Sequence, residues 1–178
     1  MVMGSVSASV VSHASCPVVV VREDNHVTDS TKYGPVVVGV DGSEVSQKAT
    51  AYAFREAQAR GAALIAVHTW MDMQVQASLA GLSAAQSEWA DIEKEQSELL
   101  TENLKEPREE YPEVEVKKLI TRDRPVSALT EAAEGAQLLV VGSHGRGGFK
   151  GMLLGSTSRA LLQSAPCPMM VVRPDDED

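Results

Sequence analysis

Cysteines, aromatic residues and long apolar runs are all scarce in this sequence of 178 residues. The two cysteines, Cys16 and Cys167, stand far apart, and neither belongs to a CxxC or Cys/His pattern that would indicate a metal site. No apolar run approaches the roughly 20 residues of a transmembrane helix. The N-terminus also lacks the basic region and the apolar core of a signal peptide. We therefore expect no membrane partner, and we take the reduced cytoplasm as the default location.

Positive charge is also in the minority. The chain has 16 Lys and Arg against 25 Asp and Glu, and its net charge is −9. Because no stripe of basic residues offsets this charge, duplex nucleic acid is a poor partner candidate. An anionic ligand is still compatible with the chain if backbone N–H groups supply the positive potential locally. The length suits one domain of about 100 to 150 residues, with some chain left over.

The sequence contains a broken internal repeat. Residues 152–175 resemble residues 1–24 at a constant offset of 151 positions, without a gap. The identical pairs include Gly4/Gly155, Ser5/Ser156, Ser7/Ser158, Cys16/Cys167, Pro17/Pro168, Val20/Val171, Val21/Val172 and Arg22/Arg173. A chance similarity of two Val-rich segments is the alternative, which the gapless match disfavours. We interpret residues 1–24 as the end of a preceding repeat, 25–33 as a polar linker, 34–174 as a complete second copy, and 175–178 as an acidic tail.

Strand and helix patterns alternate along the second copy. Apolar runs predict strands at 35–40, 63–69, 114–120, 137–141 and 167–173. Amphipathic segments between them predict helices, with Ser43 as a cap of the first, Gly61 at its end, Pro125 in the first turn of a later one, and Pro107 helping to stop the long helix at 87–105. This alternation predicts an α/β fold, with a parallel sheet and helices on both faces. Residues 1–24 predict a helix at 5–12 followed by a strand.

Glycine recurs through residues 142–156, the loop after the fourth of these strands. Glycines allow backbone N–H groups to approach a ligand closely, and the helix that opens at Gly155 has a positive N-terminus that favours an anion. Four side chains of this region could add hydroxyl groups or positive charge: Ser156, Ser158, Arg146 and Lys150. The loop therefore predicts a phosphate cradle at the carboxyl end of a parallel strand. Neither the P-loop spacing nor GxGxxG is present.

A single carboxylate, Asp41, follows the first strand of the second copy. Its residue type leaves two interpretations open: a turn with a helix cap, or a contact to ribose hydroxyls or a metal. Together with Ser143 and His144 it could suggest a hydrolase, but there is no GxSxG elbow, and adjacent Ser and His residues do not indicate an oriented nucleophile–base pair. His68 lies in an apolar strand, which favours a buried, hydrogen-bonded histidine over a ligand-binding one.

The spacing G-2x-G-9x-G-S that starts at Gly142 resembles the ATP-binding signature of universal stress proteins. Val-Gly-Val-Asp-Gly-Ser at the first strand, His68-Thr69 at the second and Cys-Pro-x-x-Val-Val-Arg at the last resemble the same family. The resemblance covers about residues 34–174. It implies a Rossmann-like, open, five-stranded parallel sheet of strand order 3-2-1-4-5, with helices on both faces.

The resemblance also implies a set of nucleotide-binding positions. Asp41 would face the ribose or an ATP-bound Mg²⁺, and Thr69 the adenine and ribose. The full set is Gly39, Val40, Asp41, Thr69, Val141, Gly142, His144, Gly145, Arg146, Gly155, Ser156 and Thr157. No residue is assigned a catalytic role. The sequence departs from the family before Pro125, where the family often has glycine and Arg124 could be either an anion contact or plain surface.

The function that the resemblance implies is that of an ATP-binding, nucleotide-dependent sensor or interaction module of the stress response. The alternatives are a slow ATP-hydrolysing enzyme on the same site and a nucleotide-free dimerisation module. The resemblance also implies that the last strands of two domains pair antiparallel, so we expect a homodimer. The apolar strand within residues 1–24 could take part in this pairing with residues 168–173, within one chain or between two.

Overall fold

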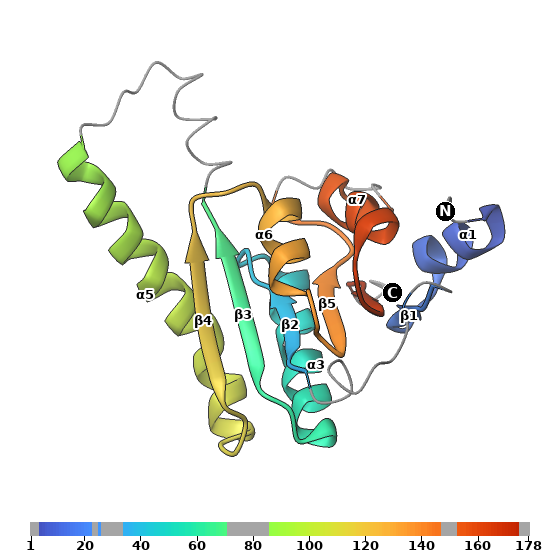
Figure 1. The fold of residues 1–178 in the computed structure, drawn as a ribbon, viewed down its shortest axis with the longest axis horizontal. Helices are drawn as coiled ribbons and strands as arrows, with labels where there is room; N and C mark the ends of the chain where they lie inside the picture. Colours follow the sequence, from blue (N-terminus) through green and yellow to red (C-terminus); the bar gives the residue numbers. More distant parts are fainter. Residues whose placement is uncertain (1–3, 23–24, 26–33, 71–85, 147–152, 175–178) are drawn as a thin grey trace.

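The structure is a computed structural model that describes residues 4–22, 25, 34–70, 86–146 and 153–174 (Figure 1). Its elements are α1 (Ser5–His13), β1 (Val18–Val20), β2 (Val36–Gly39), α3 (Glu44–Arg60), β3 (Leu64–Thr69), α5 (Gln86–Glu110), β4 (Val116–Thr121), α6 (Pro125–Ala132), β5 (Leu138–Gly142), α7 (Ser156–Ser164) and β6 (Met169–Val172). Each predicted strand and helix is present, with bounds that differ by a few residues. Lys150, the acidic tail and the linker apart from Asn25 lie outside the described residues.

The strands form one sheet in the order β1-β6-β5-β2-β3-β4. The strands β2 to β6 are parallel to their neighbours, and their order is the predicted 3-2-1-4-5 seen from the other edge. The prediction of five parallel strands is nevertheless wrong in its count, because β1 pairs antiparallel with β6 and makes a six-stranded, mixed sheet. The edge of β6 would otherwise leave a row of backbone N–H and C=O groups unpaired, and the apolar β1 satisfies them within the same chain.

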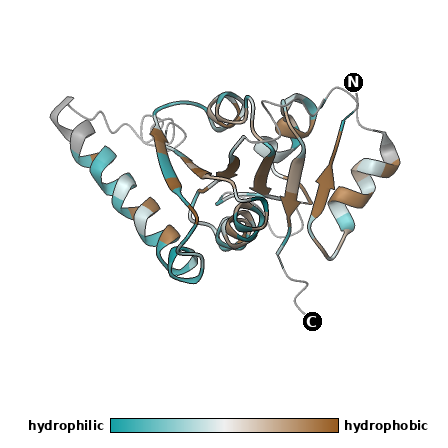
Figure 2. Cartoon of the chain, turned by 60° about the horizontal axis from the view of Figure 1, so that its bottom comes forward, coloured by the Kyte–Doolittle hydropathy of each residue, from teal (hydrophilic) through white to brown (hydrophobic). Residues whose placement is uncertain are grey.

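Helices cover both faces of the sheet (Figures 1 and 2). On one face α6, α7 and α1 pack over a core that includes Val11, Val37, Leu129, Leu139 and Leu161. On the other, α3 and α5 pack over a core that includes Val38, Phe54, Leu64, Leu100 and Leu104. Because successive side chains of a strand point to opposite faces, the continuous valine run of β2 supplies both cores. Among the helices that the structure describes, none is long and apolar enough to cross a membrane.

Local signals set the ends of most helices as predicted. The Ser43 hydroxyl accepts a 3.2 Å hydrogen bond from the Ser46 N–H at the start of α3, and Gly61 ends this helix at a φ of 58°. Pro125 lies in the first turn of α6. The prediction that Pro107 helps to stop the long helix is wrong, because α5 continues to Glu110. The proline removes one backbone donor only, and the buried stripe of α5 holds the helix against the sheet.

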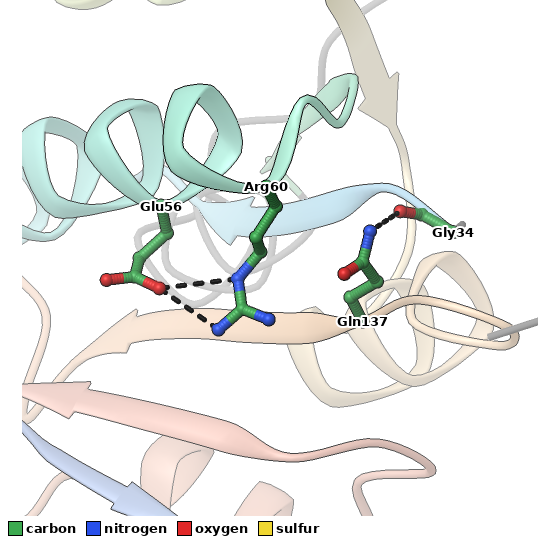
Figure 3. Close-up of polar contacts among 4 residues, drawn as sticks. All are labelled: Gly34, Glu56, Arg60 and Gln137. Carbon is green, nitrogen blue, oxygen red and sulfur yellow. Dashed lines mark hydrogen bonds and ion pairs between the residues drawn. The ribbon is translucent and has the colours of Figure 1, made fainter. Parts of the chain in front are cut away.

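Hydrogen bonds join the amino ends of β2 and β5, at the end of the strands opposite the predicted site (Figure 3). The Gln137 side chain donates a 2.8 Å hydrogen bond to the Gly34 carbonyl, and the Gln137 N–H donates one of 2.9 Å to Pro35. On α3, Arg60 forms a 3.1 Å ion pair with Glu56 one turn earlier, a surface contact that contributes about 0.3 to 0.5 kcal/mol.

Candidate functional site

The carboxyl ends of β2 and β5 are adjacent, and the chain leaves them in opposite directions. β2 leads into α3 on one face of the sheet, whereas β5 leads toward α7 on the other face. An open α/β sheet forms a crevice at such a switch point, because the two loops that follow the strands diverge. These two loops carry Asp41, His144, Gly145, Arg146 and Gly155 of the predicted set.

Asp41 occupies the first of the two loops, where its side chain forms the predicted turn; the contact to ribose or a metal stays a prediction. Its Oδ1 atom accepts a 2.9 Å hydrogen bond from the Ser43 N–H, which makes the turn before α3. The Ser46 hydroxyl accepts longer bonds from the N–H groups of Asp41 and Gly42, at 3.3 and 3.1 Å. The second carboxylate oxygen, Oδ2, accepts no hydrogen bond from any residue that the structure describes. It lies against Gly145, where it occupies the space of the missing Cβ.

Gly42 and Arg146 make a second contact between the two loops. Gly42 has a φ of +79°, and a Cβ on it would lie 2.5 Å from Nη2 of Arg146. This closeness places the Arg146 guanidinium directly on the turn that contains Asp41, although the Arg146 side chain as a whole is exposed. The structure thus brings together three residues of the predicted set, Asp41, Gly145 and Arg146, across the switch point.

The start of α7 is bound closely to the end of β5. The Gly155 N–H donates to the Ser143 carbonyl at 2.7 Å, and the Ser158 hydroxyl donates to the Gly142 carbonyl at 2.7 Å. A Cβ on Gly155 would lie 3.2 Å from the His144 Cα, and one on Gly142 would lie 2.9 Å from a methyl group of Val45. These two glycines therefore face protein atoms, and they serve the close packing of the loop on itself and on α3.

Ser143 and His144 form a pair that sequence reasoning did not anticipate. The Ser143 Oγ lies 3.0 Å from Nδ1 of His144. Ser143 is fully buried, however, and its N–H is bonded to the Val172 carbonyl at 2.7 Å. Because a nucleophile has to reach its substrate, the pair is structural, in agreement with the rejection of a hydrolase from the sequence.

The remaining predicted residues contribute from the sheet itself. Val40 and Val141 are buried in the cores of opposite faces, so their side chains do not line the crevice. Gly39 packs closely against Leu129, so a Cβ added to Gly39 would lie 3.3 Å from the Leu129 Cδ1 atom. Thr69 ends β3, next to β2 at the same edge of the sheet. Their roles in ligand binding stay predictions.

The carboxyl ends of β3 and β4 carry a buried tryptophan and several charged side chains. Trp70 follows β3 and is almost fully buried, and the Arg122 guanidinium lies 5.7 Å from the centre of its ring. Arg124, for which the sequence left two roles open, is exposed at the start of α6. Within the described residues, no group of three or more His, Cys, Asp or Glu side chains is arranged to hold a metal ion.

His68 is a buried, hydrogen-bonded histidine, as predicted. Its Nδ1 lies 2.7 Å from the Val40 carbonyl oxygen and its Nε2 lies 2.9 Å from Oε1 of Gln96 on α5. Both side chains are buried, so α5 is tied to the residue that precedes Asp41. Sequence reasoning missed Gln96. The signal that could have found it is its place on the buried stripe of α5, four residues before Leu100 and eight before Leu104.

Comparison with known proteins assigns the chain to a family. The model of the Universal stress protein family matches residues 32–173. Universal stress protein Rv2005c of Mycobacterium tuberculosis is 47% identical over 171 residues, which are 96% of this chain and 56% of that protein. A universal stress protein of Mycolicibacterium smegmatis is 45% identical over 172 residues, 97% of this chain and 56% of that protein. This chain spans about half the length of these curated relatives.

Solved structures show the same fold. A universal stress protein from Archaeoglobus fulgidus has a TM-score of 0.66 and 25% identity, over 97% of this chain and 56% of that one. A universal stress protein in complex with cAMP has a TM-score of 0.50 and 26% identity, over 79% of this chain and 97% of that one. A third, from Archaeoglobus fulgidus in complex with dAMP, is 20% identical with a TM-score of 0.52, over 79% of this chain and 98% of that one, and shows the fold alone. With the family model and the curated relatives, these findings show that the chain belongs to the universal stress protein family.

Proposed function

We propose that this chain binds an adenine nucleotide, ATP with Mg²⁺, at the carboxyl edge of its sheet and acts as a nucleotide-dependent sensor or interaction module of the stress response. The observation that carries the proposal is the meeting of Asp41, Gly145 and Arg146 at the switch point of the sheet. A universal stress protein of 26% identity in complex with cAMP supports the adenine nucleotide as the class of ligand.

The start of α7 would hold the phosphates. Gly155 precedes this helix without a side-chain cap bond, so the first N–H groups of the helix have no partner within it. Ser156 is exposed and Thr157 half-buried in this first turn, where their N–H groups and hydroxyls can donate to phosphate oxygens. Arg146 adds a positive charge from the loop after β5, which suits a ligand with more than one phosphate.

Asp41 would face the ribose and the metal. Mg²⁺ at a nucleotide site takes one or two protein carboxylates, and it completes its shell with phosphate oxygens and water. Oδ2 of Asp41 is a suitable single ligand, because Oδ1 is already engaged by the turn. In this proposal the ion arrives with the nucleotide, and Thr69 lies on the ribose side.

Hydrolysis is not part of the proposal. Ser143 is buried, and Asp41, the carboxylate at the switch point, is already engaged by the turn through Oδ1. Steady release of phosphate from ATP, above the rate of an Asp41→Asn variant, would instead identify the chain as a slow enzyme. The expected homodimer stays a prediction, because the edge of β6 is paired with β1 of the same chain.

Titration calorimetry with Mg·ATP tests the proposal. Asp41→Asn keeps an oxygen that can accept the Ser43 N–H, and it removes the charge that faces ribose and Mg²⁺. We expect about a tenfold or larger loss of affinity, which corresponds to about 1.4 kcal/mol or more, and little change in the urea midpoint of the free protein. Asp91→Asn on the exposed side of α5 makes the same change of net charge and should bind as the wild type. Equal affinities of the wild type and Asp41→Asn would contradict the proposal.

A further inference from the structure

Polar side chains in the interior of the structure gather beneath the two loops of the switch point. Among the described residues, six polar side chains are at most 4% exposed: Ser46, Thr50, His68, Gln96, Ser143 and Ser158. Burying a polar group costs free energy unless the group is hydrogen-bonded. Ser143 and Ser158 bond to His144 and Gly142 around the end of β5. The bonds of the other four hold the end of β2 and the start of α3, on either side of Asp41.

The strand pairing of the sheet stops just before Asp41. The pairing of β2 with β3 ends at Gly39, and the Val40 N–H adds one further bond to the Val67 carbonyl, at 2.8 Å. The next backbone groups are the carbonyl of Val40, a buried residue, and the N–H of Asp41, which belong to the same peptide unit. Buried backbone groups need hydrogen-bond partners, and here side chains supply them in place of a neighbouring strand.

The peptide unit between Val40 and Asp41 is bonded on both of its edges. Nδ1 of His68 donates to the Val40 carbonyl at 2.7 Å, and the Asp41 N–H donates to the Ser46 hydroxyl at 3.3 Å. The Gly42 N–H donates to the same hydroxyl at 3.1 Å. Because a trans peptide is planar, with its carbonyl and its N–H on opposite edges, bonds on both edges fix its rotation about the chain direction. The rotation of this unit sets the direction in which the Asp41 side chain leaves the backbone.

The two side chains that bond this peptide are themselves held in place. Nε2 of the His68 ring lies 2.9 Å from Oε1 of Gln96, a side chain of α5 that is 1% exposed. Partners at both ring nitrogens fix the orientation of the ring. The Ser46 hydroxyl donates to the Ser43 carbonyl at 3.1 Å, which leaves its lone pairs for the two N–H groups. His68 and Ser46 therefore act on the Asp41 peptide directly, and Gln96 acts on it through His68.

Stability alone does not explain a histidine and a glutamine at these positions. Two apolar side chains of the same shape are about as stabilising as a buried, hydrogen-bonded pair. An apolar pair could not bond to the Val40 carbonyl, and this bond acts on the residue next to Asp41. Asp41 has one carboxylate oxygen in the turn and the other against Gly145, so a small rotation of the peptide would move Oδ2 away from the switch point.

We propose that His68, Ser46 and Gln96 are positioning residues of the nucleotide site. Through the Val40–Asp41 peptide they hold Oδ2 of Asp41 at the switch point, where it would meet ribose hydroxyls and Mg²⁺. This inference rests on the proposed function. A carboxylate that is already in place loses little freedom when the ligand binds, and it therefore gives a higher affinity than a mobile one. The helix α5, which supplies Gln96, thus contributes to a site whose loops follow β2 and β5.

Two amide replacements of His68 separate positioning from a merely structural role. The amide nitrogen of asparagine lies as many bonds from Cβ as Nδ1 of histidine, and that of glutamine as many as Nε2. His68→Asn therefore keeps a donor for the Val40 carbonyl, whereas His68→Gln moves the donor toward Gln96. Each variant loses one of the two bonds of the ring, so both should lower the urea midpoint of the free protein.

Titration calorimetry with Mg·ATP should distinguish these two variants. We expect His68→Asn to bind within about threefold of the wild type and His68→Gln to lose about tenfold or more in affinity, because only the second variant releases the Val40 carbonyl. A structural role would not distinguish the two bonds of the ring. Equal affinities of His68→Asn and His68→Gln would therefore overturn the proposal.

Ser46→Ala tests the other edge of the peptide with a smaller change. It should lower the affinity for Mg·ATP about fivefold or more, because the N–H groups of Asp41 and Gly42 lose their acceptor. Thr50→Val is the matched control, since it also removes a buried hydroxyl of α3, one that donates to the Ser46 carbonyl within the helix. This control should bind as the wild type. An affinity of Ser46→Ala equal to that of the wild type would also overturn the proposal.

Gln96→Leu tests the part of α5. It should weaken binding in the wild type and have no further effect in His68→Asn, whose shorter amide does not replace Nε2. Equal losses in both backgrounds would contradict a role of Gln96 through His68. The wild type itself tests the proposed function: if it does not bind Mg·ATP, the proposed function fails, whereas a wild type that binds and variants that bind equally well overturn this inference alone.

Discussion

The hydrogen bonds of His68 provide a quantitative test of how α5 is tied to the site. The Val40 carbonyl can only accept, so Nδ1 of His68 carries a proton and donates it to this oxygen. The Gln96 side chain is the partner of the other ring nitrogen, with its Oε1 atom 2.9 Å from Nε2. Replacing Gln96 by leucine keeps helix propensity and approximate size, and it leaves Nε2 buried without a partner.

A double-mutant cycle with Gln96→Leu and His68→Leu isolates this pair. A buried polar group without a partner costs about 1 to 3 kcal/mol. The apolar gain of a new leucine at position 96 is common to both backgrounds and cancels in the cycle. We therefore expect a coupling free energy of about 1 to 3 kcal/mol, with Gln96→Leu far less harmful once His68 is absent.

Urea denaturation followed by far-UV circular dichroism measures the four free energies of unfolding. Glu98→Leu is the matched control, since Glu98 is exposed on the same helix, and its effect should stay within about 0.5 kcal/mol. Nitrogen chemical shifts of the His68 ring should show a proton on Nδ1. A coupling energy below about 0.5 kcal/mol, or a ring with its proton on Nε2, would refute the reasoning.

Four further predictions concern glycines and cysteines. Gly155→Ala should cost about 1 to 3 kcal/mol in urea unfolding, because its Cβ would crowd the His144 backbone. Gly4→Ala, at the equivalent helix start in open space, is its control. Gly34→Ala should destabilise the fold more than Gly155→Ala, because its Cβ would overlap a carbonyl oxygen of the turn after α6; an equal urea midpoint would disprove this. Burial raises the pKa of Cys167 from 9.0 to about 11, so stability should fall as pH rises between these values, where the unfolded chain ionises first. At pH 8 iodoacetamide should label the exposed Cys16 but not Cys167.

Patterns within a few residues were sufficient to predict most of the elements. Ser43, Gly61 and Pro125 act on backbone groups within about one helical turn, so their effects are legible in the sequence. Pro107 shows the limit of such rules. The local preference predicts a stop, but Leu100 and Leu104 are buried against the sheet, and this packing outweighs the loss of one hydrogen bond.

Glycine spacing predicted a loop of the candidate site, but not what its glycines contact. The sequence interpretation gave them all to the ligand, whereas Gly142 packs on Val45 in the first turn of α3 and Gly155 packs on His144. Gly145 meets Asp41 across the switch point. These contacts join residues far apart in the chain, and their distances depend on how the strands are ordered in the sheet.

The sequence by itself determined that residues 18–20 form a strand. These residues are valines, which favour strands, and they repeat the pattern of the last strand, β6. It did not determine the partner, since the edge of β6 can accept a strand from any chain. Tertiary structure decided for β1 of the same chain, where Arg22 donates to the Ala165 carbonyl and Arg173 donates to the Ala14 carbonyl. Gln96 is a similar case: its helix is polar, and only its distance from His68, 28 positions earlier, gives this amide a buried partner. A hydrogen bond in the interior depends on which surfaces pack together. A single sequence indicates that packing only where it contains a repeat or a motif of known spacing.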